Sequence, residues 1–254
     1  MAHYITINHD KRFIAFFSPK CGRNTIANWF KRSLDIDVDD HDSDVNGHLI
    51  DLSRLSNYPD YHKVIFIRNP FRRLVSFFSL WVVRNDVLWC FADDARQVSL
   101  QGKSFAEFVD CLDALWSDGR EFQHHLKPQM RGLDGITFDD VIRLETFNAD
   151  IERLNQRLQI RYTPRHLNPT PYDATRREPV WALRPDDLRG AIPTYEWFYN
   201  DRLIDIVNRI YAADVRFYYH HLKPLSRRGE EPTLPRQPAM AWTPPSVNGK
   251  NHLP

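Results

Sequence analysis

The chain has 254 residues, of which 42% are hydrophobic and 13% aromatic, so it can bury one sizeable core and is expected to be globular. Its 34 lysine and arginine residues balance 33 aspartate and glutamate residues, and the formal net charge of +1 argues against a nucleic-acid-binding protein. The three cysteines, Cys21, Cys90 and Cys111, lie far apart without a C-x-x-C pair, so neither a disulfide framework nor a metal site is expected.

The N-terminal stretch MAHYITINHDKR lacks the features of a secretory signal, which are a charged start, an apolar run and a small-residue cleavage site. No stretch approaches the roughly 18 to 20 uninterrupted apolar residues that cross a bilayer. We therefore expect a protein that does not span a membrane. The cysteine usage favours a reducing, cytoplasmic location.

Short runs of β-branched and aromatic residues at 3–7 and 12–17 predict the first two strands. Apolar residues at helical spacing from Asn24 onward predict a helix directly after them. Residues 63–67, KVIFI, form a continuous apolar run of the kind that is buried on both faces of a parallel sheet. A helix with an apolar stripe is predicted next, over 69–83.

The second half of the chain continues this alternation of strands and helices. Ser104 and Glu107 form a capping-box pattern, which predicts a helix start at this point. Residues 141–144 predict a short strand, 146–158 a helix, and 201–211 a final amphipathic helix. The alternation favours an α/β fold with a central, mostly parallel sheet flanked by helices.

The composition changes near residue 222. Beyond it, prolines are interspersed with serine, glycine and charged residues, and too little apolar surface remains to form a core. We therefore predict one domain over residues 1–222 and a proline-rich, disordered tail over 223–254.

The loop SPKCG between the second strand and the first helix places Lys20 before Gly22. The first N–H groups of a helix lack partners and carry the positive end of its dipole, so this turn is a candidate anion site to which Lys20 adds a charge. The alternative is an ordinary turn with a solvated lysine. The lysine precedes the glycine, so the loop lacks the G-x-x-x-x-G-K-[ST] order of an ATPase or GTPase.

Arg68 follows the buried run 63–67, and Ser76 lies two turns into the next helix. Ligands of open α/β sheets bind outside the carboxyl ends of strands, and a guanidinium fork matches a phosphate, so Arg68 and Ser76 can hold one anion together. The alternative is that Arg68, Arg72 and Arg73 form a solvated helix start. Arginines there are unfavourable for the helix dipole, which points to an anion nearby.

PKCG after one strand and RNPFRRLVSFF after a later strand resemble the two nucleotide-binding signatures of sulfotransferases that use 3'-phosphoadenylyl sulfate (PAPS). The R-x-P-x-x-R-x-x-S-x-F form is similar to the carbohydrate-type branch, sulfotransferase family 2. VIRLETF, RHLNPTP and RIYAADVRFYYH resemble later landmarks of the family in the same order, so the resemblance spans residues 13–220. It implies a P-loop-like, three-layer fold.

The resemblance also implies the site residues and the PAPS donor. A lysine at the departing phosphate oxygen stabilises its charge, and no metal is required. The family usually has small hydroxyl residues just after the glycine, whereas this chain has Arg23 and Asn24 before Thr25. The implied donor-binding residues are Lys20, Cys21, Gly22, Arg23, Asn24 and Thr25 at the 5'-phosphosulfate, with Arg68 and Ser76 at the 3'-phosphate.

An alcohol acceptor must lose a proton, and a histidine with a pKa near neutral is an efficient base. His48 is the first candidate, because its Gly-His pair resembles the base of a heparan-type branch of the family. His124 and His125 come second, because their H-x-x-x-Q segment resembles a landmark on the acceptor side. Asp42 or Asp44 is the remaining alternative. The predicted catalytic residues are Lys20, His48 and His125.

These features together predict a sulfotransferase that moves the sulfuryl group of PAPS to a hydroxyl of a carbohydrate or glycoconjugate. Two alternatives remain: a non-catalytic nucleotide- or glycan-binding protein on the same fold, and a small-molecule kinase. Glu145, in RLETF, is interpreted as a structural carboxylate that holds the loop before its helix.

Overall fold

The computed structural model describes residues 3–37, 44–84, 99–162, 164 and 172–220. The predicted proline-rich tail, 223–254, lies outside the described residues, so the domain boundary at residue 222 stays a prediction. In the part of the chain that is described, no helix combines the length and the apolar character that crossing a bilayer requires.

Four strands form one sheet in the order β1-β2-β3-β4. β1 and β2 pair antiparallel, whereas β2 with β3 and β3 with β4 pair parallel, which confirms the predicted mostly parallel sheet. Neighbouring parallel strands point the same way, so the carboxyl ends of β2, β3 and β4 meet at one edge. The strands are β1 (Tyr4–Asn8), β2 (Phe13–Phe17), β3 (His62–Ile67) and β4 (Asp140–Arg143).

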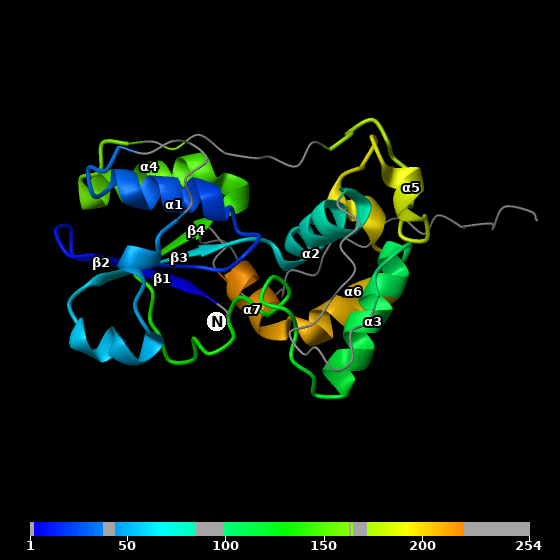
Figure 1. The fold of residues 1–254 in the computed structure, drawn as a ribbon, viewed down its shortest axis with the longest axis horizontal. Helices are drawn as coiled ribbons and strands as arrows, with labels where there is room; N and C mark the ends of the chain where they lie inside the picture. Colours follow the sequence, from blue (N-terminus) through cyan, green and yellow to red (C-terminus); the bar gives the residue numbers. More distant parts are fainter. Residues whose placement is uncertain (1–2, 38–43, 85–98, 163, 165–171, 221–254) are drawn as a thin grey trace, which may run out of the picture.

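Helices cover both faces of this sheet (Figure 1). One face packs on α1 (Arg23–Arg32) and α4 (Phe147–Leu158), and the opposite face packs on α7 (Ala212–His220) and neighbouring loops. Alternate strand residues point to opposite faces, so both sets must be apolar, which explains the continuous apolar runs. The first set is Phe13, Ala15, Phe17, Val64, Phe66 and Ile142; the second includes Ile14, Phe16, Ile65 and Ile67.

A second core, built from helices, lies beyond the carboxyl edge of the sheet (Figure 1). Its aromatic centre joins Phe78 to Phe105, Phe108 and Phe198 at ring-centroid distances of 5.3, 5.7 and 6.2 Å. The carboxyl edge of the sheet therefore faces this helical core. The helices are α2 (Pro70–Phe78), α3 (Phe105–Ser117), α5 (Pro185–Leu188) and α6 (Asp201–Ile210).

Short helical turns complete the described secondary structure. The π-helical turn η3 (Ser79–Arg84) continues α2, and η5 (Leu144–Thr146) leads from β4 into α4. The remaining turns are η1 (Asn46–His48), η2 (Leu52–Asn57) and η6 (Tyr195–Phe198). The predicted final helix at 201–211 is α6, but a further helix, α7, follows it.

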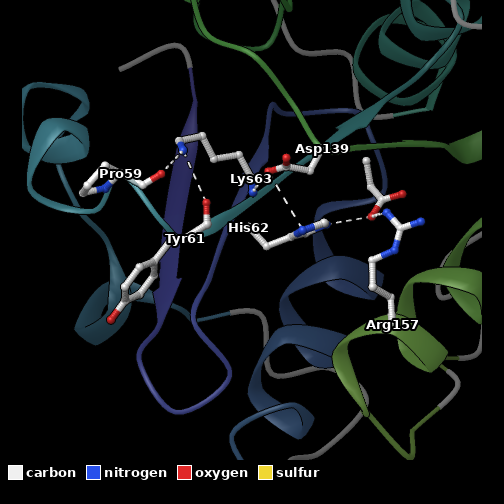
Figure 2. A network of polar contacts seen from close by, with 7 residues as sticks. Pro59, Tyr61, His62, Lys63, Asp139 and Arg157 are labelled. Atoms are coloured by element: carbon white, nitrogen blue, oxygen red, sulfur yellow. Dashed lines mark hydrogen bonds and ion pairs between the residues drawn. The ribbon is translucent and has the colours of Figure 1, made fainter.

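A polar network holds the amino ends of β3 and β4 to α4 (Figure 2). His62 Nε2 lies 2.7 Å from Asp140 Oδ2, and Arg157 Nη1 donates to the same oxygen at 2.7 Å. The backbone N–H of Lys63 donates to Asp139 Oδ2 at 2.7 Å. These contacts fix the strands at the edge opposite to their carboxyl ends.

The capping box predicted for Ser104 and Glu107 is present at the start of α3. The Ser104 hydroxyl accepts from the Glu107 N–H at 3.3 Å, and Glu107 Oε2 accepts from the Ser104 N–H at 2.7 Å. Arg184 donates to the same Glu107 oxygen at 2.5 Å. The cap thus joins α3 to the segment before α5.

Ser104→Ala removes the side-chain cap of α3 and should cost about 1 kcal/mol of unfolding free energy, lowering Tm by roughly 2–4 °C. Thermal unfolding followed by circular dichroism measures the change. Ser53→Ala, at an exposed position of η2, is the control and should leave Tm unchanged. Equal Tm values for both variants would show that the cap contributes nothing.

Candidate active site

The loop between β2 and α1, residues 18–22, has the backbone of an anion-binding turn. Lys20 has a φ of 69° and Gly22 a φ of 86°, so both adopt the left-handed conformation. Gly22 is the N-cap of α1 and supplies no side-chain hydrogen bond, and the first turn of this helix contains no acidic residue. The first N–H groups of α1 and the positive end of its dipole therefore lie at the loop without a protein anion.

Gly22 is suited to its position mainly by its backbone. A φ of 86° is strained for any residue with a side chain. A Cβ atom at residue 22 would lie 2.8 Å from Cδ1 of Leu144, a contact that movement of the leucine tip can relieve. The conformational requirement is therefore the stronger reason for glycine here.

Arg68 lies beside this loop because β2 and β3 are parallel neighbours. Phe17, the last residue of β2, pairs with Phe66 of β3, so the residues that follow both strands share one edge. Arg68 Nη1 donates to the carbonyl oxygen of Lys20 at 3.1 Å. Ser76 is buried on α2, the helix that leaves this edge. The structure thus brings together the two segments that the sequence predicted to hold opposite ends of one nucleotide.

The other predicted donor-loop residues have different environments. Cys21 and Thr25 are buried, whereas Asn24 is half-buried. Burial raises the pKa of the Cys21 thiol, which favours its neutral form. The Arg23 guanidinium lies 4.7 Å from the centre of the Tyr4 ring, so Arg23 leans toward β1.

Arg73 fixes the lysine loop to a distant segment, and the sequence did not identify this role. The residue is only 3% exposed. Nε donates to the carbonyl oxygen of Pro19 at 3.1 Å, and Nη2 donates to the carbonyl oxygens of His125 and Lys127 at 3.0 and 2.9 Å. The segment 125–127 is therefore held beside the lysine loop.

Glu145 holds the start of α2. Its Oε1 accepts from the backbone N–H of Asn69 at 3.0 Å, and its Oε2 accepts from the Tyr218 hydroxyl at 2.9 Å. The Asn69 side chain in turn caps α2 by accepting from the N–H groups of Phe71 and Arg72. Glu145 therefore makes structural contacts, but they hold the start of α2 and α7 and not, as the sequence predicted, the loop before its own helix.

The site concentrates positive charge that the described residues do not neutralise. Arg68 and Arg73 donate to backbone carbonyls, and no carboxylate among the described residues lies within ion-pair distance of Lys20, Arg68 or Arg73. Burial, and then Arg68 and Arg73, lower the pKa of Lys20 from 10.5 to about 7. Such a site favours an anionic ligand, because an anion relieves the repulsion among these cations.

His125 lies within the same positive cluster. Its Nδ1 is 3.1 Å from Oε1 of Gln123, and its ring centre lies 5.4 Å from that of Trp81. Burial, then His124 and then Lys20 lower the pKa of His125 to about 3, so its imidazole is neutral at physiological pH. His124 is exposed beside it, with ring centres 4.0 Å apart.

His48 lies elsewhere in the structure. Its ring contacts Phe30, toward the carboxyl end of α1, at a centroid distance of 5.5 Å. Leu49 forms an antiparallel bridge to Thr6, which places His48 toward the end of β1 that pairs with the start of β2. The lysine loop leaves the other end of β2. The structure therefore does not bring His48 to Lys20.

One acidic alternative for the base, Asp44, is exposed two residues before η1, the turn that contains His48. The other, Asp42, lies outside the described residues. Among the residues that the structure describes, no group of three His, Cys, Asp or Glu side chains is placed to hold a metal ion.

Comparison with known proteins gives one match. A family model described as "Sulfotransferase family" matches residues 3–220, which include the lysine loop, the Arg68 segment and α7. No curated protein and no solved structure matches this chain.

The depressed pKa of Lys20 predicts that the affinity for adenosine 3',5'-bisphosphate falls as the pH rises from 7 to 9. Above pH 7 the free protein carries a neutral Lys20, so binding of the anion must take up a proton, and affinity should fall by up to about tenfold per pH unit. Isothermal titration calorimetry in two buffers of different ionisation enthalpy measures both the affinity and the proton uptake.

Lys20→Met should bind more weakly and show no proton uptake over this range. Lys103→Met, at a lysine on the segment before α3, is the matched control and should behave like the unsubstituted protein. Affinity of the unsubstituted protein that stays constant between pH 7 and 9 would contradict the assignment of Lys20.

Proposed function

Because this chain belongs to the sulfotransferase family, whose members are PAPS-dependent enzymes, we propose that it transfers the sulfuryl group of PAPS to a hydroxyl of a carbohydrate or glycoconjugate. The observation that carries this proposal is the hydrogen bond between the Arg68 guanidinium and the Lys20 carbonyl. It joins two cationic segments at one sheet edge, where a nucleotide with phosphates at both ends of its ribose can bridge them.

The donor set fits such a nucleotide. The left-handed turn at Lys20 and Gly22 and the uncapped start of α1 offer backbone N–H groups to a phosphosulfate. Arg68, at the end of β3, offers a guanidinium that can bind the 3'-phosphate, with Ser76 on the following helix. In the reaction the acceptor oxygen bonds to sulfur as the bond from sulfur to the phosphate oxygen breaks. The phosphate leaves with the electron pair, and Lys20 stabilises its charge.

We assign the base to His125 in preference to His48, because His125 lies in the positive cluster around Lys20. The contact with Gln123 suits an Nδ1–H donor, which leaves Nε2 as the nitrogen that accepts the proton of the acceptor hydroxyl. Arg73 supports this assignment, since one guanidinium holds both the His125 backbone and the Pro19 carbonyl of the lysine loop.

A carbohydrate acceptor suits the surroundings of His125. The half-buried Trp81 ring contacts the imidazole edge to face, and aromatic rings form apolar surfaces with polar edges, which complement the mixed faces of sugar rings. The acceptor would then place a hydroxyl at the imidazole while its ring packs on the indole.

The proposed activity is tested with purified protein, labelled PAPS and a panel of glycan acceptors, with product mass as the readout. We expect a gain of one sulfuryl group in at least one glycan and release of adenosine 3',5'-bisphosphate. Binding of the bisphosphate without transfer to any glycan or small-molecule hydroxyl would favour a non-catalytic binding protein. Binding of ATP with phosphate transfer would instead favour a kinase.

His125→Ala should lower kcat by about 100-fold or more, because the general base is removed. The affinity for adenosine 3',5'-bisphosphate should change by less than about threefold, since the imidazole is neutral before the donor binds. His48→Ala is the matched control and should retain kcat. If His48→Ala lost kcat and His125→Ala retained it, the base would be His48, the residue that the sequence alone favoured.

A further inference from the structure

Gln129 connects the two halves of the proposed donor site through its side-chain amide. Its Oε1 accepts from the backbone N–H of Arg68 at 2.9 Å and from the Cys21 thiol at 2.9 Å. Its Nε2 donates to the carbonyl oxygen of Arg68 at 2.9 Å. One buried amide, 3% exposed as a residue, thus binds both backbone groups of Arg68 and a side chain of the lysine loop.

The backbone of Gln129 is itself fixed by a buried carboxyl group. Asp214 on α7 accepts from the Gln129 N–H at 2.7 Å with Oδ2 and from the Met130 N–H at 2.8 Å with Oδ1. Asp214 is 2% exposed, so solvent does not compete for these bonds. The Gln129 amide is therefore a rigid link between α7, the end of β3 and the lysine loop.

The hydrogen-bonding needs of the Arg68 backbone explain why a primary amide suits position 129. β3 ends at Ile67, so the peptide groups of Arg68 have left the strand ladder and need other partners. A glutamine side chain presents an acceptor oxygen and a donor nitrogen, which pair with the N–H and the C=O of Arg68 as another strand would. The second lone pair of Oε1 remains for the thiol of Cys21.

We propose that Gln129 is a positioning residue that sets the separation between the lysine loop and Arg68, so that both ends of a 3',5'-bisphosphorylated nucleotide are bound at once. This inference rests on the proposed function. A ligand with two phosphates gains affinity from correctly spaced sites, because the second contact forms without further ordering. A ligand with one phosphate gains little from the spacing.

The test compares adenosine 3',5'-bisphosphate with adenosine 5'-monophosphate by calorimetry at pH 7. Gln129→Met keeps the length of the side chain and removes every hydrogen bond that the side-chain amide makes. We expect the Kd of the bisphosphate to rise by about 10- to 100-fold and that of the monophosphate by less than about threefold. The positioning role is measured by the affinity ratio, which is the affinity for the bisphosphate divided by the affinity for the monophosphate. Neither affinity alone measures it.

Asn155→Leu is the matched control, because Asn155 is another buried amide that links distant segments. It accepts from Trp29 Nε1 at 2.8 Å and donates to the Tyr162 carbonyl at 2.7 Å, in the layer of α1 and α4. We expect this variant to lose stability and to keep the affinity ratio. A ratio that stays unchanged in Gln129→Met, or that falls equally in both variants, would overturn the inference.

Cys21→Ala keeps the inference testable if Gln129→Met does not fold. It removes the bond from the loop to Gln129, together with a 3.2 Å contact to the Ser18 hydroxyl, and leaves the bonds between Gln129 and Arg68 in place. The affinity ratio should fall by about three- to tenfold, and an unchanged ratio overturns the inference. Failure of the proposed function is distinguishable in the unsubstituted protein. Binding of the bisphosphate without sulfuryl transfer overturns the function and leaves the ratio test in place, whereas no binding of the bisphosphate at all overturns the function. That result would remove the premise of the inference as well.

Discussion

The site depends on how its charged side chains are partnered. Arg68 and Arg73 donate to backbone carbonyls, while Glu145 and Asp214 accept from backbone N–H groups. These opposite charges therefore fix the backbone without forming ion pairs with one another. A buried ion pair in their place would have satisfied both partners and left no positive potential for a ligand. With this arrangement Lys20 is buried in a field of like charges, and burial first, then Arg68 and Arg73, lower its pKa. The binding energy of an anionic donor comes in part from relief of that repulsion.

The strand order is what brings these charges to one place. β2 and β3 are parallel and adjacent, so a loop after one and an arginine after the other meet at the same edge, although 48 residues separate Lys20 from Arg68. α7 lies on the face of the sheet opposite to α1 and α4 (Figure 1). Its Asp214 accepts hydrogen bonds from the N–H groups of residues 129 and 130. The network around His62 at the far edge keeps β3 and β4 aligned, which maintains the position of the carboxyl ends. The fold thus gathers cationic side chains from distant parts of the sequence at the carboxyl edge of the sheet.

The sequence predicts the parts of this arrangement that local chemistry determines. Continuous apolar runs, a glycine turn after a strand and a capping box each have a short-range signature, and all of them appear in the structure. The contacts of Gln129 and Arg73 have no such signature, because their partners lie 52 to 108 positions away and are mostly backbone groups that every residue carries. α7 was missed as a separate helix because its buried side, with Asp214 and Tyr218, is partly polar. The placement of His48 beside Phe30 required the bridge from Leu49 to β1, which spacing along the chain does not reveal.

In the proposed reaction, the environment of His125 links donor binding to proton transfer. An imidazole with a pKa of about 3 is a weak base, and a weak base contributes little to the removal of a proton from a sugar hydroxyl. After burial and His124, the causes of this low value are Lys20, Arg73 and Arg23, which are cations of the donor site. A bound phosphosulfate adds negative charge among the same cations, so it raises the pKa of His125 and makes the imidazole a stronger base. In the proposed reaction, His125 is therefore a stronger base with the donor bound than without it.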